Sequence, residues 1–132
     1  MCSIMGITSK TLKPEDFKEY FDRTISRGPD MSRILETKSG YLCFHRLAIM
    51  GLEESGMQPF TLGENSVVCN GEIYCFRALK KELSKEFTFK SGSDCEIILP
   101  LYLKCGVEMF KRLDAEFAMV IYDGKKDKYI AA

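Results

Sequence analysis

The sequence predicts an α+β fold in which the sheets are mostly antiparallel. Strand-like segments follow one another in hairpin-like runs, and helical segments lie between these runs. Segment 41–50 is apolar on both of its faces, which is typical of a strand whose sheet is covered on both sides. No repeat, linker or low-complexity segment divides the 132 residues, so the chain should form one domain with a genuine core.

The first half of the chain should contain an amphipathic helix that starts at Pro14. Proline suits the first turn of a helix, and the two acidic residues that follow it favour the positive end of the helix dipole. Phe17, Tyr20, Phe21 and Ile25 then fall on one face. The elements expected up to position 70 are a strand at 3–7, this helix at 14–25, a turn at 27–30, and strands at 34–37, 41–50 and 66–70.

The second half should contain a long helix that begins at Ser93. Ser93 and Glu96 have the spacing of a capping box, Pro100 should kink the helix, and Gly106 suits its end. The other elements expected here are a helix at 76–85, a short strand at 87–90, a helical piece at 107–113, and a hairpin of strands 115–123 and 128–132.

Charge and hydropathy exclude several classes of function. Nineteen acidic and nineteen basic side chains give a formal net charge of zero, so nothing indicates nucleic acid or an anionic membrane as a partner. The longest apolar run, 97–103, is far too short to span a bilayer, and the N-terminus has no signal-peptide pattern. We therefore expect a cytoplasmic protein that binds neither nucleic acid nor membrane.

The six cysteines should be reduced in that compartment. There is no Cys-x-x-Cys pair and no histidine cluster, so no metal site is expected. Most of the cysteines are interpreted as small buried apolar side chains, namely Cys43, Cys69, Cys95 and Cys105.

Cys2 differs from the others because removal of Met1 would make it the N-terminal residue. It would then carry a thiol and an α-amine on one residue. A cysteine thiol ordinarily has a pKa of about 8.5, and a terminal α-amine has a pKa of about 7.7–8.0. The amine, directly or through a water, could take the thiol proton near neutral pH. The alternative is a Met-Cys start with no functional meaning.

Arg46 interrupts an otherwise apolar strand-like segment. A guanidinium buried there needs an anion, because an isolated charge is costly to remove from water. One interpretation is an internal Asp or Glu partner. The other is a bidentate clamp on the carboxylate of a ligand. The sequence pattern favours neither.

The segment Asn70-Gly71-Glu72 also allows two interpretations. Asn-Gly between apolar pairs is the strongest short hairpin signal. Alternatively, an asparagine amide and a neighbouring backbone N–H form an oxyanion hole. Asp94, in the first turn of the expected long helix, either complements the helix dipole or pairs with a substrate ammonium group.

Together these features resemble the glutaminase domain of glutamine-hydrolysing asparagine synthetases, which are class II amidotransferases of the N-terminal-nucleophile hydrolase superfamily. The resemblance extends from Met1 to Ala132. The segments that carry it, in order, are Met1–Gly6 (MCSIMG), Arg27–Asp30 (RGPD), His45–Ile49 (HRLAI), Gln58-Pro59, Asn70–Tyr74 (NGEIY), Ser91–Glu96 (SGSDCE) and Leu113–Ala118 (LDAEFA).

The resemblance implies a four-layer α/β/β/α sandwich and an acyl-transfer reaction that hydrolyses L-glutamine and releases ammonia for asparagine synthesis. It implies that Cys2 is the nucleophile and that its α-amine is the base. It implies that Asn70 and Gly71 form the oxyanion hole. It implies the following substrate-binding residues: Arg46 for the glutamine α-carboxylate, Glu72 and Asp94 for its α-ammonium, and the backbone around Leu47 and Ile49 for the pocket wall.

No cofactor or metal is expected in this chain, because ATP and Mg²⁺ would serve only a synthetase domain. The chain departs from the family in two respects. Cys75 stands where asparagine is more frequent, and residues 1–132 would be a glutaminase domain without its last strands and without the synthetase domain. We expect such a fragment to be marginally stable alone, and a synthetase domain or subunit to be its partner.

Two alternatives remain open at this stage. One is a catalytically silent module that binds glutamine or a partner. The other is a Cys–His hydrolase with His45 as the base, although His45 and Arg46 should point to opposite faces of their strand.

Overall fold

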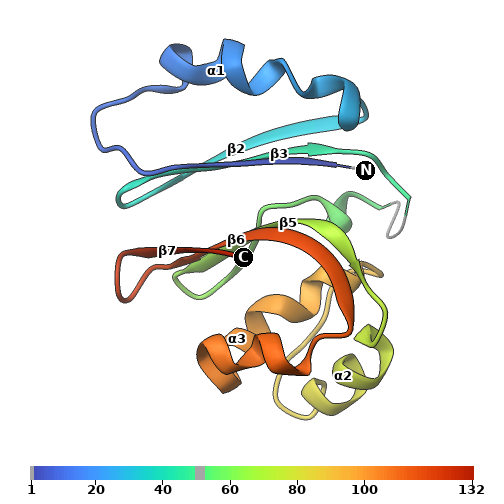
Figure 1. The fold of residues 1–132 in the computed structure, drawn as a ribbon. Helices are drawn as coiled ribbons and strands as arrows, with labels where there is room; N and C mark the ends of the chain where they lie inside the picture. The colour runs from blue at the N-terminus through green and yellow to red at the C-terminus, as the bar shows by residue number, and fades with distance from the viewer. Residues whose placement is uncertain (1, 50–52) are drawn as a thin grey trace.

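A computed structural model describes residues 2–49 and 53–132 of the chain (Figure 1). The question of Met1 removal therefore falls outside the described residues, as does position 50 of the strand expected at 41–50. The first sheet has the order β1-β3-β2, with β1 (Ser3–Ile7) and β2 (Met31–Thr37) on either side of β3 (Gly40–Arg46). Both pairings are antiparallel. The strand expected at 41–50 ends earlier than predicted, since β3 ends at Arg46 and residues 47–49 are not part of a strand.

The second sheet has the order β4-β5-β6-β7 and is also antiparallel throughout. Its strands are β4 (Phe60–Leu62), β5 (Asn65–Ile73), β6 (Ala115–Asp123) and β7 (Lys128–Ala131). The expected hairpin near the C-terminus is confirmed as β6 and β7. The longest pairing joins β5 to β6, with Ser66 opposite Tyr122 and Ile73 opposite Ala115.

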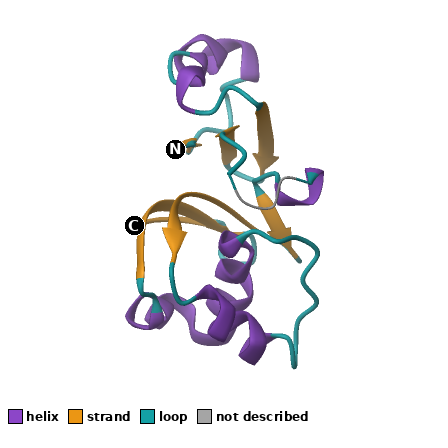
Figure 2. Cartoon of the chain, turned by 90° about the vertical axis from the view of Figure 1, so that its right-hand side faces the viewer, coloured by secondary structure: helices purple, strands orange, loops and turns teal. Residues whose placement is uncertain are grey.

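The two sheets lie face to face, and helices cover the outer face of each (Figures 1 and 2). Helix α1 (Pro14–Asp22) packs on the first sheet, and α2 (Phe76–Leu83) and α3 (Ile98–Cys105) pack on the second. This α/β/β/α layering confirms the predicted α+β sandwich. Every residue of β3 is buried, as expected for a strand whose sheet is covered on both sides.

Three apolar clusters fill the spaces between the layers. Leu42 and Phe44 of β3 meet Val68 of β5 between the sheets. Phe17 and Phe21 of α1 pack over the outer face of β3. A larger cluster joins β5 and β6 to α2, α3 and the segments around them. Full burial of one such Leu or Phe side chain stabilises the fold by about 1.5–3 kcal/mol.

The expected helices end earlier than the sequence pattern indicates. Helix α1 ends at Asp22 and is followed by the 3-10 turn η1 (Ile25–Arg27), so Tyr20 and Ile25 are exposed rather than part of the buried face. The long helix expected from Ser93 is divided into η3 (Asp94–Ile97), α3 and η4 (Gly106–Arg112). Gly106 separates the last two with a φ of +58°, which suits a residue without a side chain.

One of the two interpretations of Asn70-Gly71, and one predicted strand, are wrong. Asn70 and Gly71 form no hairpin, because both lie inside β5 and pair with β6. Segment 87–90 is not a strand, since it has no ladder partner among the described residues. It lies between the end of α2 and η3, where Glu96 accepts hydrogen bonds from the backbone N–H groups of Lys90 (2.6 Å) and Ser91 (2.9 Å).

Candidate active site

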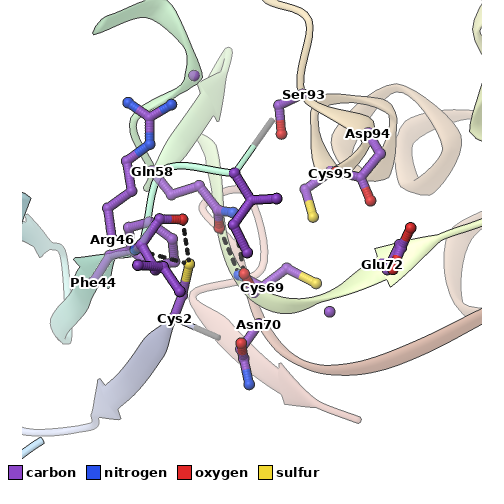
Figure 3. A pocket seen from close by; sticks show the side chains of 14 residues that line it. Cys2, Phe44, Arg46, Gln58, Cys69, Asn70, Glu72, Ser93, Asp94 and Cys95 are labelled. Carbon is purple, nitrogen blue, oxygen red and sulfur yellow. Dashed lines mark hydrogen bonds between the residues drawn. The ribbon is translucent and has the colours of Figure 1, made fainter. Parts of the chain in front are cut away.

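A pocket of about 170 Å³ lies where β1 begins, β3 ends and β5 passes beneath them (Figure 3). Every residue predicted for the catalytic or substrate-binding site lines this pocket. Among the described residues, the lining is formed by Cys2, Phe44, Arg46, Leu47, Ile49, Gly56, Gln58, Cys69, Asn70, Gly71, Glu72, Ser93, Asp94 and Cys95. The fold thus brings together residues that are more than ninety positions apart in the sequence.

Cys2 is held at the pocket by the strand that follows it. Pairing of Ser3 with His45 places the start of β1 beside the end of β3. The backbone N–H of Leu47 donates to Cys2 Sγ (3.3 Å), and Sγ lies 3.6 Å from the Leu47 carbonyl oxygen. A donor aimed at the sulfur would stabilise negative charge there. The N-terminal segment is therefore fixed rather than frayed.

Asn70 reaches the pocket because side chains alternate along a strand. Val68, two residues earlier in β5, packs between the two sheets. Asn70 is on the same face, so its side chain lies on the side of the second sheet that faces the first (Figure 3). The thiol from one sheet and the amide from the other therefore line one cavity.

The backbone N–H of Gly71 is directed to the pocket edge of β5. In an antiparallel strand the N–H and C=O groups of alternate residues point to the same side. On this side Cys69 bonds to the side chain of Gln58, and the Ile73 N–H donates to Asp94 Oδ2 (2.7 Å). Gly71 lies between them in this alternation, so its N–H points the same way.

Glycine is required at position 71 by the approach of β6. A Cβ atom there would lie 2.4 Å from the Glu116 carbonyl oxygen and 2.7 Å from Phe117 Cα. The physical reason for the Asn-Gly pair is thus close strand packing beside the pocket, and no turn is involved.

The charged residues Arg46, Glu72 and Asp94 line the same pocket as Cys2. Arg46 is 3% exposed, and its Nη1 donates to the carbonyl oxygen of Glu53 (3.1 Å) as well as lying 3.8 Å from Met31 Sδ. Asp94 is 6% exposed and Glu72 is exposed. The Ile73 N–H occupies only part of the acceptor capacity of the Asp94 carboxylate, since an ionised carboxylate has about four lone-pair positions.

Of the four cysteines predicted to be buried, Cys43, Cys69 and Cys95 are buried, whereas Cys105 is only half-buried. Burial raises the pKa of the Cys43 thiol to about 12. A hydrogen bond with Cys69, together with burial, raises the pKa of the Cys95 thiol well above its usual range. Both thiols therefore stay protonated near neutral pH and serve as packing groups, as the sequence predicted.

His45 points away from the pocket, as the alternation of strand residues predicted. Its ring stacks on Phe21, with ring centroids 3.6 Å apart. Nε2 lies 3.1 Å from the Phe21 carbonyl oxygen, and Nδ1 lies 2.6 Å from Ser32 Oγ. His45 is a hydrogen-bonded core residue, and this position disfavours the Cys–His hydrolase alternative.

The turn at residues 27–30 supports the site in a way that the sequence patterns did not predict. Arg27 Nε donates to the carbonyl oxygen of Cys2 (3.2 Å), and Asp30 Oδ2 accepts from the N–H of Ala48 (2.8 Å). A Cβ on Gly28 would lie 2.2 Å from the His45 carbonyl oxygen. The turn is therefore hydrogen-bonded both to Cys2 and to the segment after β3. The unusual Arg-Gly-Pro-Asp sequence was the available signal for this role.

The described parts of the chain contain neither a metal centre nor a membrane span. There, no group of three or more His, Cys, Asp or Glu side chains could hold a metal ion. No described helix is both long and apolar enough to cross a bilayer.

Comparison with known proteins gives a consistent picture. A family model described as "Glutamine amidotransferase domain" matches residues 1–132. A probable asparagine synthetase [glutamine-hydrolyzing] from Schizosaccharomyces pombe is 38% identical over 138 residues, covering 100% of this chain and 25% of that protein. Asparagine synthetase B [glutamine-hydrolyzing] from Escherichia coli is 38% identical, covering 98% of this chain and 24% of its own length. Amidase chyE from Penicillium rubens is 36% identical, covering 89% of this chain and 18% of its own length.

This chain thus spans about a quarter of the length of the two asparagine synthetases. The match of the family model over the whole chain shows that it belongs to the glutamine amidotransferase domain family.

Proposed function

We propose that this chain is a glutaminase that converts L-glutamine and water to glutamate and ammonia, with Cys2 as the nucleophile. The observation that carries the proposal is that a single pocket joins the Cys2 thiol from the first sheet to Asn70 and Gly71 from the second. A nucleophile and two potential oxyanion donors around one cavity are the parts that acyl transfer needs.

In the first half-reaction, Cys2 Sγ attacks the side-chain carbonyl carbon of glutamine, and the thiol proton passes to the α-amine of Cys2. This requires prior removal of Met1. The oxyanion accepts hydrogen bonds from the Asn70 side-chain amide and the Gly71 N–H. The C–N bond then breaks, and the leaving nitrogen takes a proton from the α-ammonium to depart as ammonia.

In the second half-reaction, water attacks the γ-glutamyl thioester while the α-amine removes its proton. The same two donors stabilise the second oxyanion. Collapse of this intermediate breaks the C–S bond, returns the proton to the thiolate and releases glutamate. The cycle uses glutamine, water and groups of the chain, with no cofactor or metal.

Substrate recognition follows from the charges at the pocket wall. Glutamine carries one carboxylate and one ammonium group at its α-carbon, so its site needs one cation and at least one anion. We assign the carboxylate to Arg46 and the ammonium to Asp94 and Glu72. The backbone at Leu47 and Ile49 would complete the wall. All of these residues line the pocket.

The use of the released ammonia is proposed from the names of the relatives. Two of the relatives are named as glutamine-hydrolysing asparagine synthetases and are about four times longer than the matching segment. We therefore propose that the ammonia serves asparagine formation by a synthetase domain or subunit. We also propose a cytoplasmic location, where the six free cysteines would stay reduced.

The direct test is to measure ammonia and glutamate released from L-glutamine by the purified chain. Mass spectrometry of the intact protein would first establish that Met1 has been removed. We expect equimolar release of both products, and no ammonia from L-asparagine at the same concentration, since its side chain is one methylene shorter. A processed chain that releases neither product from glutamine would contradict the proposal and favour a catalytically silent module.

Replacement of Arg46 by alanine tests the proposed substrate contacts. Removing one partner of a buried charge pair costs about 2–5 kcal/mol of binding, so KM should rise about 30-fold or more while kcat changes less. Arg46→Lys is the matched control, because lysine keeps the positive charge but lacks the bidentate fork of arginine. Its KM should lie between that of the unmodified chain and that of Arg46→Ala. Steady-state kinetics checks both variants, and an unchanged KM in Arg46→Ala would overturn this assignment.

A further inference from the structure

Gln58 lines the pocket but has no part in the reaction described above. Its side chain is buried, with 5% exposed, and both ends of its amide are used. Nε2 donates to the carbonyl oxygen of Cys69 (3.1 Å), and Oε1 accepts from the N–H of Cys69 (2.6 Å). A single side chain therefore satisfies both backbone groups of the residue that precedes Asn70.

The register of β4 and β5 explains why a side chain is needed here. In this pairing Phe60, the first residue of β4, lies opposite Val67. Continued by two residues in each strand, the same register would place Gln58 opposite Cys69. The backbone of Gln58 lies outside β4, so it does not continue this ladder. Gln58 thus reaches its register partner with its side-chain amide, which carries a donor and an acceptor as a backbone unit does.

The segment held in this way contains the two proposed oxyanion donors. Cys69 comes directly before Asn70, and Gly71 is the next residue whose N–H faces the same edge of β5. At the far end of the segment, Asp94 Oδ2 accepts the Ile73 N–H (2.7 Å). Side chains from outside the sheet therefore bond to β5 on both sides of the donor pair, Gln58 at Cys69 (Figure 3) and Asp94 at Ile73.

We propose that Gln58 is a positioning residue: its amide takes the place of a missing strand and fixes the segment that presents Asn70 and Gly71 to the reacting carbonyl. This inference rests on the proposed glutaminase function. Gln58 does not touch the substrate in this scheme. It acts through Cys69, so its loss should change the turnover rate more than substrate binding.

The first test is Gln58→Ala in the full chain. A displacement of catalytic donors by about 1 Å can cost about 10²-fold in rate. We therefore expect kcat for ammonia release to fall by about 10-fold to 10²-fold and KM to change by less than about threefold. A KM that rises while kcat stays constant would overturn the proposal, as would two unchanged constants.

Asn65→Ala is the matched control. Asn65 lies at the opposite end of β5, is 4% exposed, and accepts the Gly124 N–H on its side-chain Oδ1 (3.0 Å). Its loss also removes a buried bond between an amide side chain and the backbone, but far from the pocket. We expect both alanine variants to unfold at lower temperature, and only Gln58→Ala to lose kcat. Equal kcat loss in the two variants would mean a general effect of stability and would overturn the proposal.

The variant Gln58→Glu should show a pH dependence of kcat that a general loss of stability would not produce. A protonated carboxyl group has one donor and one acceptor and can replace the amide, whereas a carboxylate cannot donate to the Cys69 carbonyl. Burial raises the pKa of an introduced carboxyl group. The ratio of the variant's kcat to that of the unmodified chain should therefore rise as the pH is lowered. A ratio that is constant with pH would overturn the proposal.

A measurement without turnover separates this inference from the proposed function. If the processed chain releases no ammonia, the glutaminase proposal fails, and amide hydrogen exchange by NMR still tests Gln58. The Cys69 N–H should exchange at least about tenfold faster in Gln58→Ala than in Asn65→Ala, because it loses its acceptor. Equal Cys69 exchange in the two variants would overturn the positioning role.

Discussion

Alanine in place of Cys2 should abolish ammonia release from glutamine, with a loss of about 10³-fold or more. The variant keeps the pocket and the oxyanion donors but has no atom that can form the thioester. The Cys2 thiol is half-buried and its hydrogen bonds are to the backbone of Leu47, so the fold should persist. Ammonia release and the midpoint of thermal unfolding, measured on the same preparation, check both expectations.

Cys105→Ala is the control for the loss of a thiol. Cys105 is also half-buried and lies at the end of α3, outside the pocket. Its replacement should leave kcat unchanged. Appreciable turnover in Cys2→Ala would show that another group attacks the substrate, and the proposed mechanism would then be wrong.

Replacing Asn70 by alanine should lower kcat by about 10²–10³-fold, which corresponds to about 2.7–4 kcal/mol of transition-state stabilisation. The side-chain amide is one of two donors assigned to the oxyanion, and this charge exists only after the carbonyl has been attacked. KM should therefore change far less than kcat. Steady-state kinetics with glutamine measures the two separately.

The second asparagine of β5 again provides the comparison. Asn65 lies in the same strand, but its amide holds the N–H of Gly124 rather than facing the pocket. Asn65→Ala should affect thermal unfolding and leave kcat close to that of the unmodified chain. If Asn70→Ala kept full turnover, the oxyanion would have to be stabilised by other donors, and the assignment of Asn70 would fail.

Local patterns in the sequence were sufficient for several parts of this fold. Short apolar segments indicate β1 and the β6–β7 hairpin around its turn, and the apolar run around Leu42 and Phe44 indicates a strand between two covering layers. These predictions succeeded because a buried strand requires apolar residues within its own segment, and these can be seen in the sequence without knowledge of the partner strand. The site residues that the family resemblance implied all line one pocket of the structure.

The errors arose where a distant partner decides the local conformation. Asn70-Gly71 has the composition of a hairpin turn, yet β6 pairs with it and makes it part of a strand. The capping pattern at Ser93 and Glu96 suggested a regular helix. In the fold, Asp94 and Glu96 bond instead to the backbone of Ile73 and of the segment at 90–91, and the first turn is a 3-10 helix.

The role of Gln58 shows most clearly which features depend on local sequence and which depend on tertiary structure. Composition, periodicity and position in the chain were enough to predict the α+β class and the special position of Cys2, and the family resemblance implied eight of the residues that line the pocket. No local pattern shows that β4 begins only at Phe60, or that its register carries Gln58 to Cys69. Hydrogen bonds between elements depend on strand register and on where each ladder ends. These are properties of the assembled sheets, so only the tertiary structure decided which side chains hold the oxyanion segment in place.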